Sequence, residues 1–265
     1  MDERQPGERR FGEEGGLLTY GTYLRVPELL DQQRPLAQPP AHDELLFITV
    51  HQVYELWFKQ LLHELEGARA AMYDGQLWWA RHLLGRVRTI ERVLIEQLDV
   101  LETMTPQDFL AFRTRLAPAS GFQSVQFREL EFLSGLKDPA FLDRLRDTST
   151  EERERLERRL AEPTLWDAFL HVLRTAGLDT TEESLPDSLV RIAGDRGTYD
   201  EVWALAERLI EHDEGAALWR ARHVLMVERQ IGAKSGTGGS SGGPYLRRRL
   251  DLRYYPALWE LRSRL

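Results

Sequence analysis

The chain has 265 residues, of which 42% are hydrophobic and 29% charged, a composition typical of a soluble protein with a sizeable core. Its 35 basic and 43 acidic residues give a formal net charge of −8, which offers no support for binding to nucleic acid or to an anionic membrane. It has no cysteine, so disulfides, thiolate zinc sites and iron–sulfur clusters are excluded.

The N-terminal residues 1–16 are polar, charged and glycine-containing, so we expect a disordered tail and no signal peptide. A short ordered piece follows at residues 17–27 and contains Tyr20 and Tyr23. The three prolines of residues 31–40 are typical of a loop. No run of 18 apolar residues occurs in the sequence, so we expect no membrane span and a cytoplasmic protein.

Apolar residues at helical spacing occupy most of the remaining chain. Asp43 is the expected cap of a first long helix that runs to about Met72. Thr105, followed by Pro106 and Asp108, is a strong helix start signal. Further helices are predicted at residues 76–104, 122–132, 149–161, 164–176, 184–194 and 199–231. Alternating β patterns and internal linkers are absent, which predicts an all-α fold: one domain over residues 17–265, built as a bundle of long helices.

His51 lies within a strongly apolar helical stretch, with Phe47 four residues before it and Phe58 seven residues after it on one face. A lone histidine on an apolar face is usually a hydrogen-bonded core residue. The functional alternative is a polar group aimed into a dry aromatic pocket, where neutral imidazole can both donate and accept a hydrogen bond.

His212 and His223 are two candidates for a metal ligand on the last long helix. They are eleven residues apart, about 20° past three full turns and ~16 Å along the axis, so both can face one side but cannot bind the same ion. Acidic residues on both sides of His212 favour exposure, whereas the apolar run Val224–Val227 favours burial of His223. We therefore favour His223.

Seven consecutive Gly, Ser or Thr residues, Ser235–Ser241, follow that helix and its expected stop at Gly232. Such a run is usually a flexible linker, but it can also bring backbone N–H groups close to a small anion. Phe109 and Arg113 are spaced i, i+4 on one helix. They form either a surface pair or a guanidinium that binds a ligand carboxylate beside an aromatic wall.

Four segments, in this order, resemble the tryptophan 2,3-dioxygenase family, whose members are haem b enzymes: residues 18–24, 42–69, 105–133 and 219–247. The resemblance implies a helical haem dioxygenase domain that takes L-tryptophan and O₂ and produces N-formyl-L-kynurenine. It also implies a homotetramer in which the N-terminal segment of one subunit closes the pocket of its neighbour.

Individual roles follow from the matched positions. His223 aligns with the histidine that ligates the haem iron, and His51 with the distal histidine that meets the indole N–H of the substrate. Arg113 aligns with the arginine that pairs with the substrate carboxylate. Thr237 aligns with a residue that holds the α-ammonium and carboxylate, and the glycine run around it with a mobile lid that substrate orders.

Other matched positions form the surroundings of substrate and cofactor. The pocket walls align with Phe47, Phe109, Tyr20 and Tyr23, and a loop beside the haem aligns with Ser120 and Gly121.

One position departs from the family's pattern: Val53 stands where many members carry Thr or Ser. The missing hydroxyl either lies near the O₂-binding side of the haem, where it would alter hydrogen bonding, or faces away from the pocket. Three other functions stay open. One is a relative that acts on a methylated tryptophan, with insertion of one oxygen atom. The second is a haem or O₂ sensor without catalysis, and the third is a helical scaffold without a cofactor.

Overall fold

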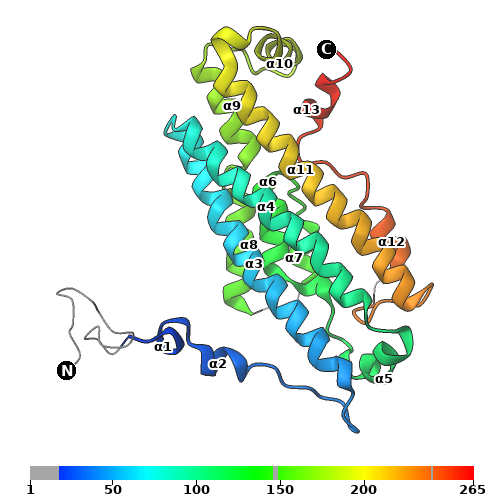
Figure 1. Ribbon diagram of the computed structural model, residues 1–265. Helices are drawn as coiled ribbons and strands as arrows, with labels where there is room; N and C mark the ends of the chain where they lie inside the picture. Colours follow the sequence, from blue (N-terminus) through cyan, green and yellow to red (C-terminus); the bar gives the residue numbers. More distant parts are fainter. Residues whose placement is uncertain (1–17, 146–148, 240) are drawn as a thin grey trace, which may run out of the picture.

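The structure is a computed structural model that describes residues 18–145, 149–239 and 241–265. All regular elements in these ranges are helical, which confirms the predicted all-α class (Figure 1). The predicted disordered tail, residues 1–16, lies outside the described part of the chain. None of the described helices combines the length and the apolar character needed to cross a membrane.

Three long helices dominate the bundle: α3 (His42–Tyr73), α4 (Leu77–Glu102) and α11 (Arg196–Ile231). α4 packs against both of the others, antiparallel to α3 and parallel to α11 (Figure 1). Apolar side chains from all three meet in the core, where Leu65, Leu84 and Leu205 are completely buried. Each such leucine contributes roughly 1.5–3 kcal/mol relative to an exposed one.

Shorter helices cover the bundle and close its ends. They are α5 (Pro106–Leu116), α6 (Val125–Ser134), α7 (Ala140–Arg144), α8 (Thr150–Ala161), α9 (Leu165–Thr175), α10 (Leu185–Gly194), α12 (Gly243–Arg247) and α13 (Pro256–Leu261). α6 packs against α3, α8 and α9, so it forms the layer opposite α4.

The helix ends test the predicted start and stop signals. Thr105 caps α5 as expected, because its Oγ1 accepts from the backbone N–H of Asp108 at 3.2 Å while the Asp108 carboxylate accepts from the backbone N–H of Thr105 at 3.2 Å. Gly232 ends α11 with a φ of 58°, as expected. The prediction for Asp43 is wrong: α3 begins at His42, with Ala41 at the cap position. Asp43 instead lies in the first turn, where its negative charge interacts favourably with the positive end of the helix dipole.

The predicted helix at 122–132 is divided in two. A short 3₁₀ turn, Gly121–Gln123, precedes α6, and the extended backbone of Ser124 separates them. Ser124 Oγ accepts from the backbone N–H of Phe127 at 3.2 Å and caps α6. The break allows the chain to turn before it packs on α3.

The N-terminal helices α1 (Tyr20–Leu24) and α2 (Val26–Leu30) extend away from the bundle (Figure 1). Their apolar side chains are exposed, with Tyr20 79% and Tyr23 71% accessible to solvent. The loop that follows is fixed to α3, where Gln52 Nε2 donates to the carbonyl of Gln32 at 3.0 Å.

Candidate active site

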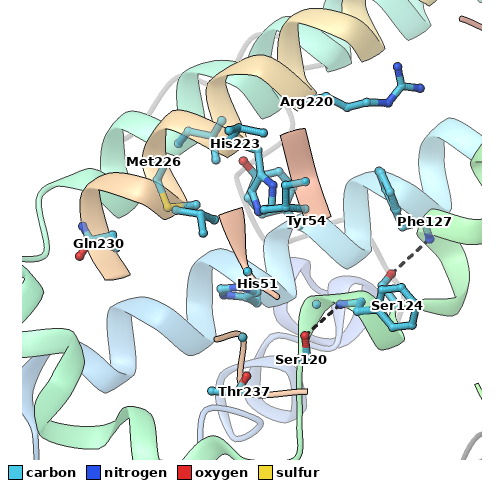
Figure 2. A pocket seen from close by; sticks show the side chains of 18 of the residues that line it. His51, Tyr54, Ser120, Ser124, Phe127, Arg220, His223, Met226, Gln230 and Thr237 are labelled. Carbon is cyan, nitrogen blue, oxygen red and sulfur yellow. Dashed lines mark hydrogen bonds between the residues drawn. The ribbon is translucent and has the colours of Figure 1, made fainter. Parts of the chain in front are cut away.

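A cavity of about 290 Å³ lies where the N-terminal half of α3 meets α5, α6 and the C-terminal end of α11 (Figure 2). Eight of the ten predicted site residues line it: Phe47, His51, Phe109, Arg113, Ser120, Gly121, His223 and Thr237. The other two, Tyr20 and Tyr23, are exposed on α1 and do not line the cavity of their own chain. Val53 is not among its described lining residues.

His51 occupies the α3 side of the cavity (Figure 2). Its Nδ1 lies 2.7 Å from the carbonyl oxygen of Phe47. Because a carbonyl can only accept, Nδ1 carries the hydrogen and Nε2 keeps a free lone pair in the neutral ring. Burial lowers the pKa of His51, and the Phe47 carbonyl and the charge of Glu55 oppose part of that effect. The site therefore presents a hydrogen-bond acceptor to the cavity at neutral pH.

His223 faces His51 from α11 (Figure 2). Its ring stacks on Trp219, with centroids 4.8 Å apart and planes 8° from parallel. Burial and the neighbouring His51 lower the pKa of His223 to about 4, so the ring is neutral at neutral pH. Among the described residues neither ring nitrogen has a hydrogen-bond partner. His223 thus offers an uncommitted neutral imidazole to the cavity.

His212 is buried, so the prediction that it is exposed is wrong. Its Nδ1 lies 2.7 Å from Glu91 Oε1, and its Nε2 lies 2.9 Å from the hydroxyl oxygen of Ser134. Asp213 is buried too, and its Oδ2 accepts from the backbone N–H groups of Tyr254 and Tyr255 at 2.9 and 3.0 Å. The acidic neighbours of His212 therefore belong in part to a buried polar network rather than to a solvated face.

Gly236 and Thr237 of the glycine run line the cavity, and the described part of the run contacts the loop before α6. Thr237 Oγ1 donates to the carbonyl of Ala119 at 2.7 Å, and the Arg113 guanidinium donates to the carbonyl of Ser235. A Cβ on Gly238 would lie 2.7 Å from the Cβ of Ser120. Only glycine therefore fits where the two loops meet.

Several wall residues were not predicted. They follow the helical spacing of the two histidines, such as Tyr54 and Glu55 after His51, and Trp219, Arg220, Met226, Val227 and Gln230 around His223. Helical spacing could have predicted these wall residues, because residues three, four and seven positions from a pocket residue share its helix face.

The α6 side of the cavity carries a cluster of cationic groups that was also missed. Arg128 and Arg249 both pair with the carboxylate of Glu131. Arg220 Nη1 donates to the carbonyl of Leu252 at 3.0 Å, but its Nε and Nη2 have no partner in the described structure. The Nε of Arg128 and the hydroxyl of Tyr245 are also buried there without a partner, as is the indole N–H of Trp219. Unpaired buried donors are costly, so this end of the cavity suits an anionic ligand.

Within the described ranges, no group of three or more His, Cys, Asp or Glu side chains could hold a bare metal ion. What the cavity provides is one imidazole without a hydrogen-bond partner, that of His223, together with aromatic walls and unpaired cationic groups. This donor set fits a planar cofactor that carries a metal, which one imidazole would hold, and carboxylates, which the cationic groups would meet.

Comparison with known proteins places this chain in a family. A sequence model described as tryptophan 2,3-dioxygenase matches residues 2–188 and 187–265. A curated tryptophan 2,3-dioxygenase from Nocardioides sp. is 65% identical over 260 residues, which cover 96% of this chain and 97% of the relative. Proteins of the same name from Herpetosiphon aurantiacus and Anaeromyxobacter dehalogenans are 46% and 44% identical, over 94% of this chain and 98% and 96% of their own lengths. The chain belongs to the tryptophan 2,3-dioxygenase family.

Proposed function

We propose that this chain is a haem-dependent L-tryptophan 2,3-dioxygenase that inserts both atoms of O₂ across the indole C2–C3 bond and gives N-formyl-L-kynurenine. The observation that carries the proposal is the pair of neutral histidines on opposite walls of one aromatic cavity. One has a lone pair directed by a backbone hydrogen bond, and the other is uncommitted.

The donor set supports haem b as the cofactor. His223 would hold the haem iron, because its imidazole is neutral, unpaired and held in orientation by Trp219. Arg128, Arg220 and Tyr245 would meet the propionate carboxylates with their unpaired donors. Ser120 and Gly121 would lie beside the ring. When bound, the haem supplies the oxygen chemistry of the reaction, which no protein side chain can provide.

The substrate would bind on the His51 side. The two stacked rings of Phe47 and Phe109, with centroids 5.7 Å apart, form an apolar wall for the indole. His51 Nε2 would accept a hydrogen bond from the indole N–H and orient the C2–C3 bond. The indole N–H is too weak an acid for easy removal, so this role is orientation rather than proton abstraction.

Arg113 and Thr237 would bind the amino-acid end of the substrate. Arg113 would exchange the Ser235 carbonyl for the substrate carboxylate, a stronger acceptor because it is charged. Thr237, which lies in the glycine run, would hold the α-ammonium and carboxylate of the substrate. The substrate would then tie this run to the cavity, and the covered site would exclude water from the reacting centre.

The assembly proposal concerns α1 and α2. Tyr20 and Tyr23 would wall the pocket of a neighbouring subunit in a homotetramer, and their exposure on a segment outside the bundle supports this. We also propose that residues 17–265 form one domain and that the protein is cytoplasmic.

The test is anaerobic reduction of haem-loaded protein, followed by L-tryptophan and O₂, with the product mass measured. We expect a product heavier than tryptophan by two oxygen atoms, with formylkynurenine absorbance. A gain of one oxygen atom, or turnover of β-methyltryptophan in preference to tryptophan, would contradict the proposal. A protein without a Soret band after haem supplementation would rule out every haem-based function.

A further inference from the structure

Glu55 lies on the same face of α3 as His51, one helical turn further on, and lines the cavity. Its position is set from another helix, because Gln126 at the start of α6 reaches across to it. Gln126 Nε2 donates to Glu55 Oε2 at 2.8 Å and to the backbone carbonyl of Glu55 at 2.9 Å. The amide thus holds the carboxylate against its own helix.

The charge of Glu55 is held but not neutralised. Glu131, the other carboxylate that lines the cavity, pairs with Arg128 and Arg249. Within the described ranges Glu55 has no ion pair, and the partner of its carboxylate is the uncharged amide of Gln126. In a cavity with apolar walls a fixed charge acts strongly on its neighbours, because the local dielectric constant is low.

The neighbour that responds is His51. The carboxylate of Glu55 raises the pKa of His51 against the larger lowering caused by burial. The other charged or titratable side chains that line this cavity are Tyr54 on α3, Arg113 on α5, Arg128 and Glu131 on α6, Arg220 and His223 on α11, Tyr245 on α12, and Arg249 after it. His223 also interacts with His51, but it is neutral at neutral pH, so Glu55 is the charged lining group that raises the pKa of His51.

We propose that Glu55 is a positioning residue for the reaction: held by Gln126, it keeps a negative charge beside His51 and strengthens the hydrogen bond that His51 Nε2 accepts from the indole N–H. The inference rests on the proposed function of His51. As the indole N–H shares its hydrogen with Nε2, partial positive charge develops on the imidazole. A nearby carboxylate stabilises that charge, and hydrogen bonds with an ionic component are about twice as strong as neutral ones.

The first test follows the ring itself. Histidine-labelled protein in the ferrous, carbon monoxide-bound form is diamagnetic, so the His51 imidazole can be titrated by NMR and assigned with His51→Asn. We expect Glu55→Gln to lower the pKa of His51, and Gln126→Leu to lower it less because the charge remains but is no longer held. Glu96→Gln removes one exposed carboxylate from α4 and should leave the titration unchanged. A His51 pKa that is the same in Glu55→Gln and wild type overturns the proposal.

The second test isolates the hydrogen bond. Glu55→Gln should weaken binding of L-tryptophan by about fivefold, on the order of 1 kcal/mol. Binding of the benzothiophene analogue of tryptophan, which has no N–H, should not change. Equal weakening of both ligands would show a general packing defect and contradict the proposal.

If Glu55→Gln fails to fold or to hold haem, Glu55→Asp decides the question, because it keeps the charge but retracts it by one methylene. We expect a smaller fall in the His51 pKa, and no fall would overturn the proposal. Failure of the proposed function looks different: wild-type protein itself would then convert no tryptophan, whatever the titration of His51.

Discussion

Two histidines on α11 show how the same side chain serves two different ends in one helix. His212 has both ring nitrogens bonded, to Glu91 and to Ser134, and its ring stacks on Tyr254. His223, eleven residues later, has neither nitrogen bonded among the described residues and faces the cavity. A histidine whose two ring nitrogens are both hydrogen-bonded within the protein stabilises the fold. A histidine whose ring nitrogens have no partner is available to a cofactor.

The surroundings of His212 explain why that region cannot be an open site. Glu91 approaches α11 at Gly215, where any Cβ would overlap the Glu91 carboxylate. Arg88 reaches the same point and also pairs with Glu214 at 3.1 Å. Charges and hydrogen bonds in such a network depend on one another, and removal of one member leaves the others buried without partners.

The largest expected effect is a loss of stability when the buried network around His212 is disrupted. Glu91→Ala should lower the free energy of unfolding by roughly 3–5 kcal/mol, because it leaves the buried Nδ1 of His212 unpaired and removes the negative charge beside Arg88. The folded fraction should still bind haem. Glu211→Ala removes a half-exposed carboxylate from α11, next to His212, and should change stability by less than about 1 kcal/mol. Denaturant titration of both variants measures this, and equal stability of Glu91→Ala and wild type would show that the network is not structural.

The cavity histidines should instead make the haem-free protein sensitive to acid. The pKa of His223 is about 4 when folded and 6.5 in the reference state. Above pH 6.5 the ring is neutral in both the folded and the unfolded state, so His223 does not lower the free energy of unfolding. As pH falls from 6.5 to 4, only the unfolded chain takes up the proton, so stability is lost by about 3 kcal/mol. Unfolding of haem-free wild type and His223→Leu across this range should differ in slope, and parallel curves would contradict the prediction.

Arg113→Ala should weaken substrate recognition without a loss of stability. The missing charge should lower kcat/KM for L-tryptophan by roughly 30- to 100-fold, about 2–3 kcal/mol, mostly through KM. Arg115→Ala is a matched control, because Arg115 is exposed on the same helix and only contacts the carbonyl of Gln38 at 3.3 Å. Unaltered affinity for tryptophan in Arg113→Ala would remove this residue from the substrate site.

His51→Ala should have the smallest effect of these substitutions. Haem should still bind, because the proposed iron ligand is His223, while turnover should fall about tenfold through loss of orientation. His63→Ala, exposed on the same helix, should turn over like wild type. If both variants keep wild-type kinetics, His51 is a core residue and no more.

The sequence predicts this fold well because its signals are local. Thr105 and Asp108 meet three residues apart, Gly232 adopts the positive φ that ends α11, and Phe47 and His51 share a face by helical geometry alone. The failures concern partners that are distant in sequence. The burial of His212 depends on Glu91, 121 residues away, and the hold on Glu55 depends on Gln126, 71 residues away. No window of sequence contains either pair.

The cationic end of the cavity was missed for the same reason. Arg128, Arg220 and Arg249 come from three separate segments, and each one alone reads as a surface arginine. Tyr20 and Tyr23 present a different case, because their predicted role belongs to a neighbouring subunit rather than to their own pocket.

Haem content of His223→Ala and His212→Ala, each purified and supplemented in the same way, tests the central claim most directly. The account predicts that His223→Ala loses the Soret band of the wild type, or shows one shifted by the loss of its axial ligand. It also predicts that the folded fraction of His212→Ala retains the wild-type spectrum and stoichiometry. A His223→Ala protein with an unchanged spectrum, full haem content and normal turnover would contradict it.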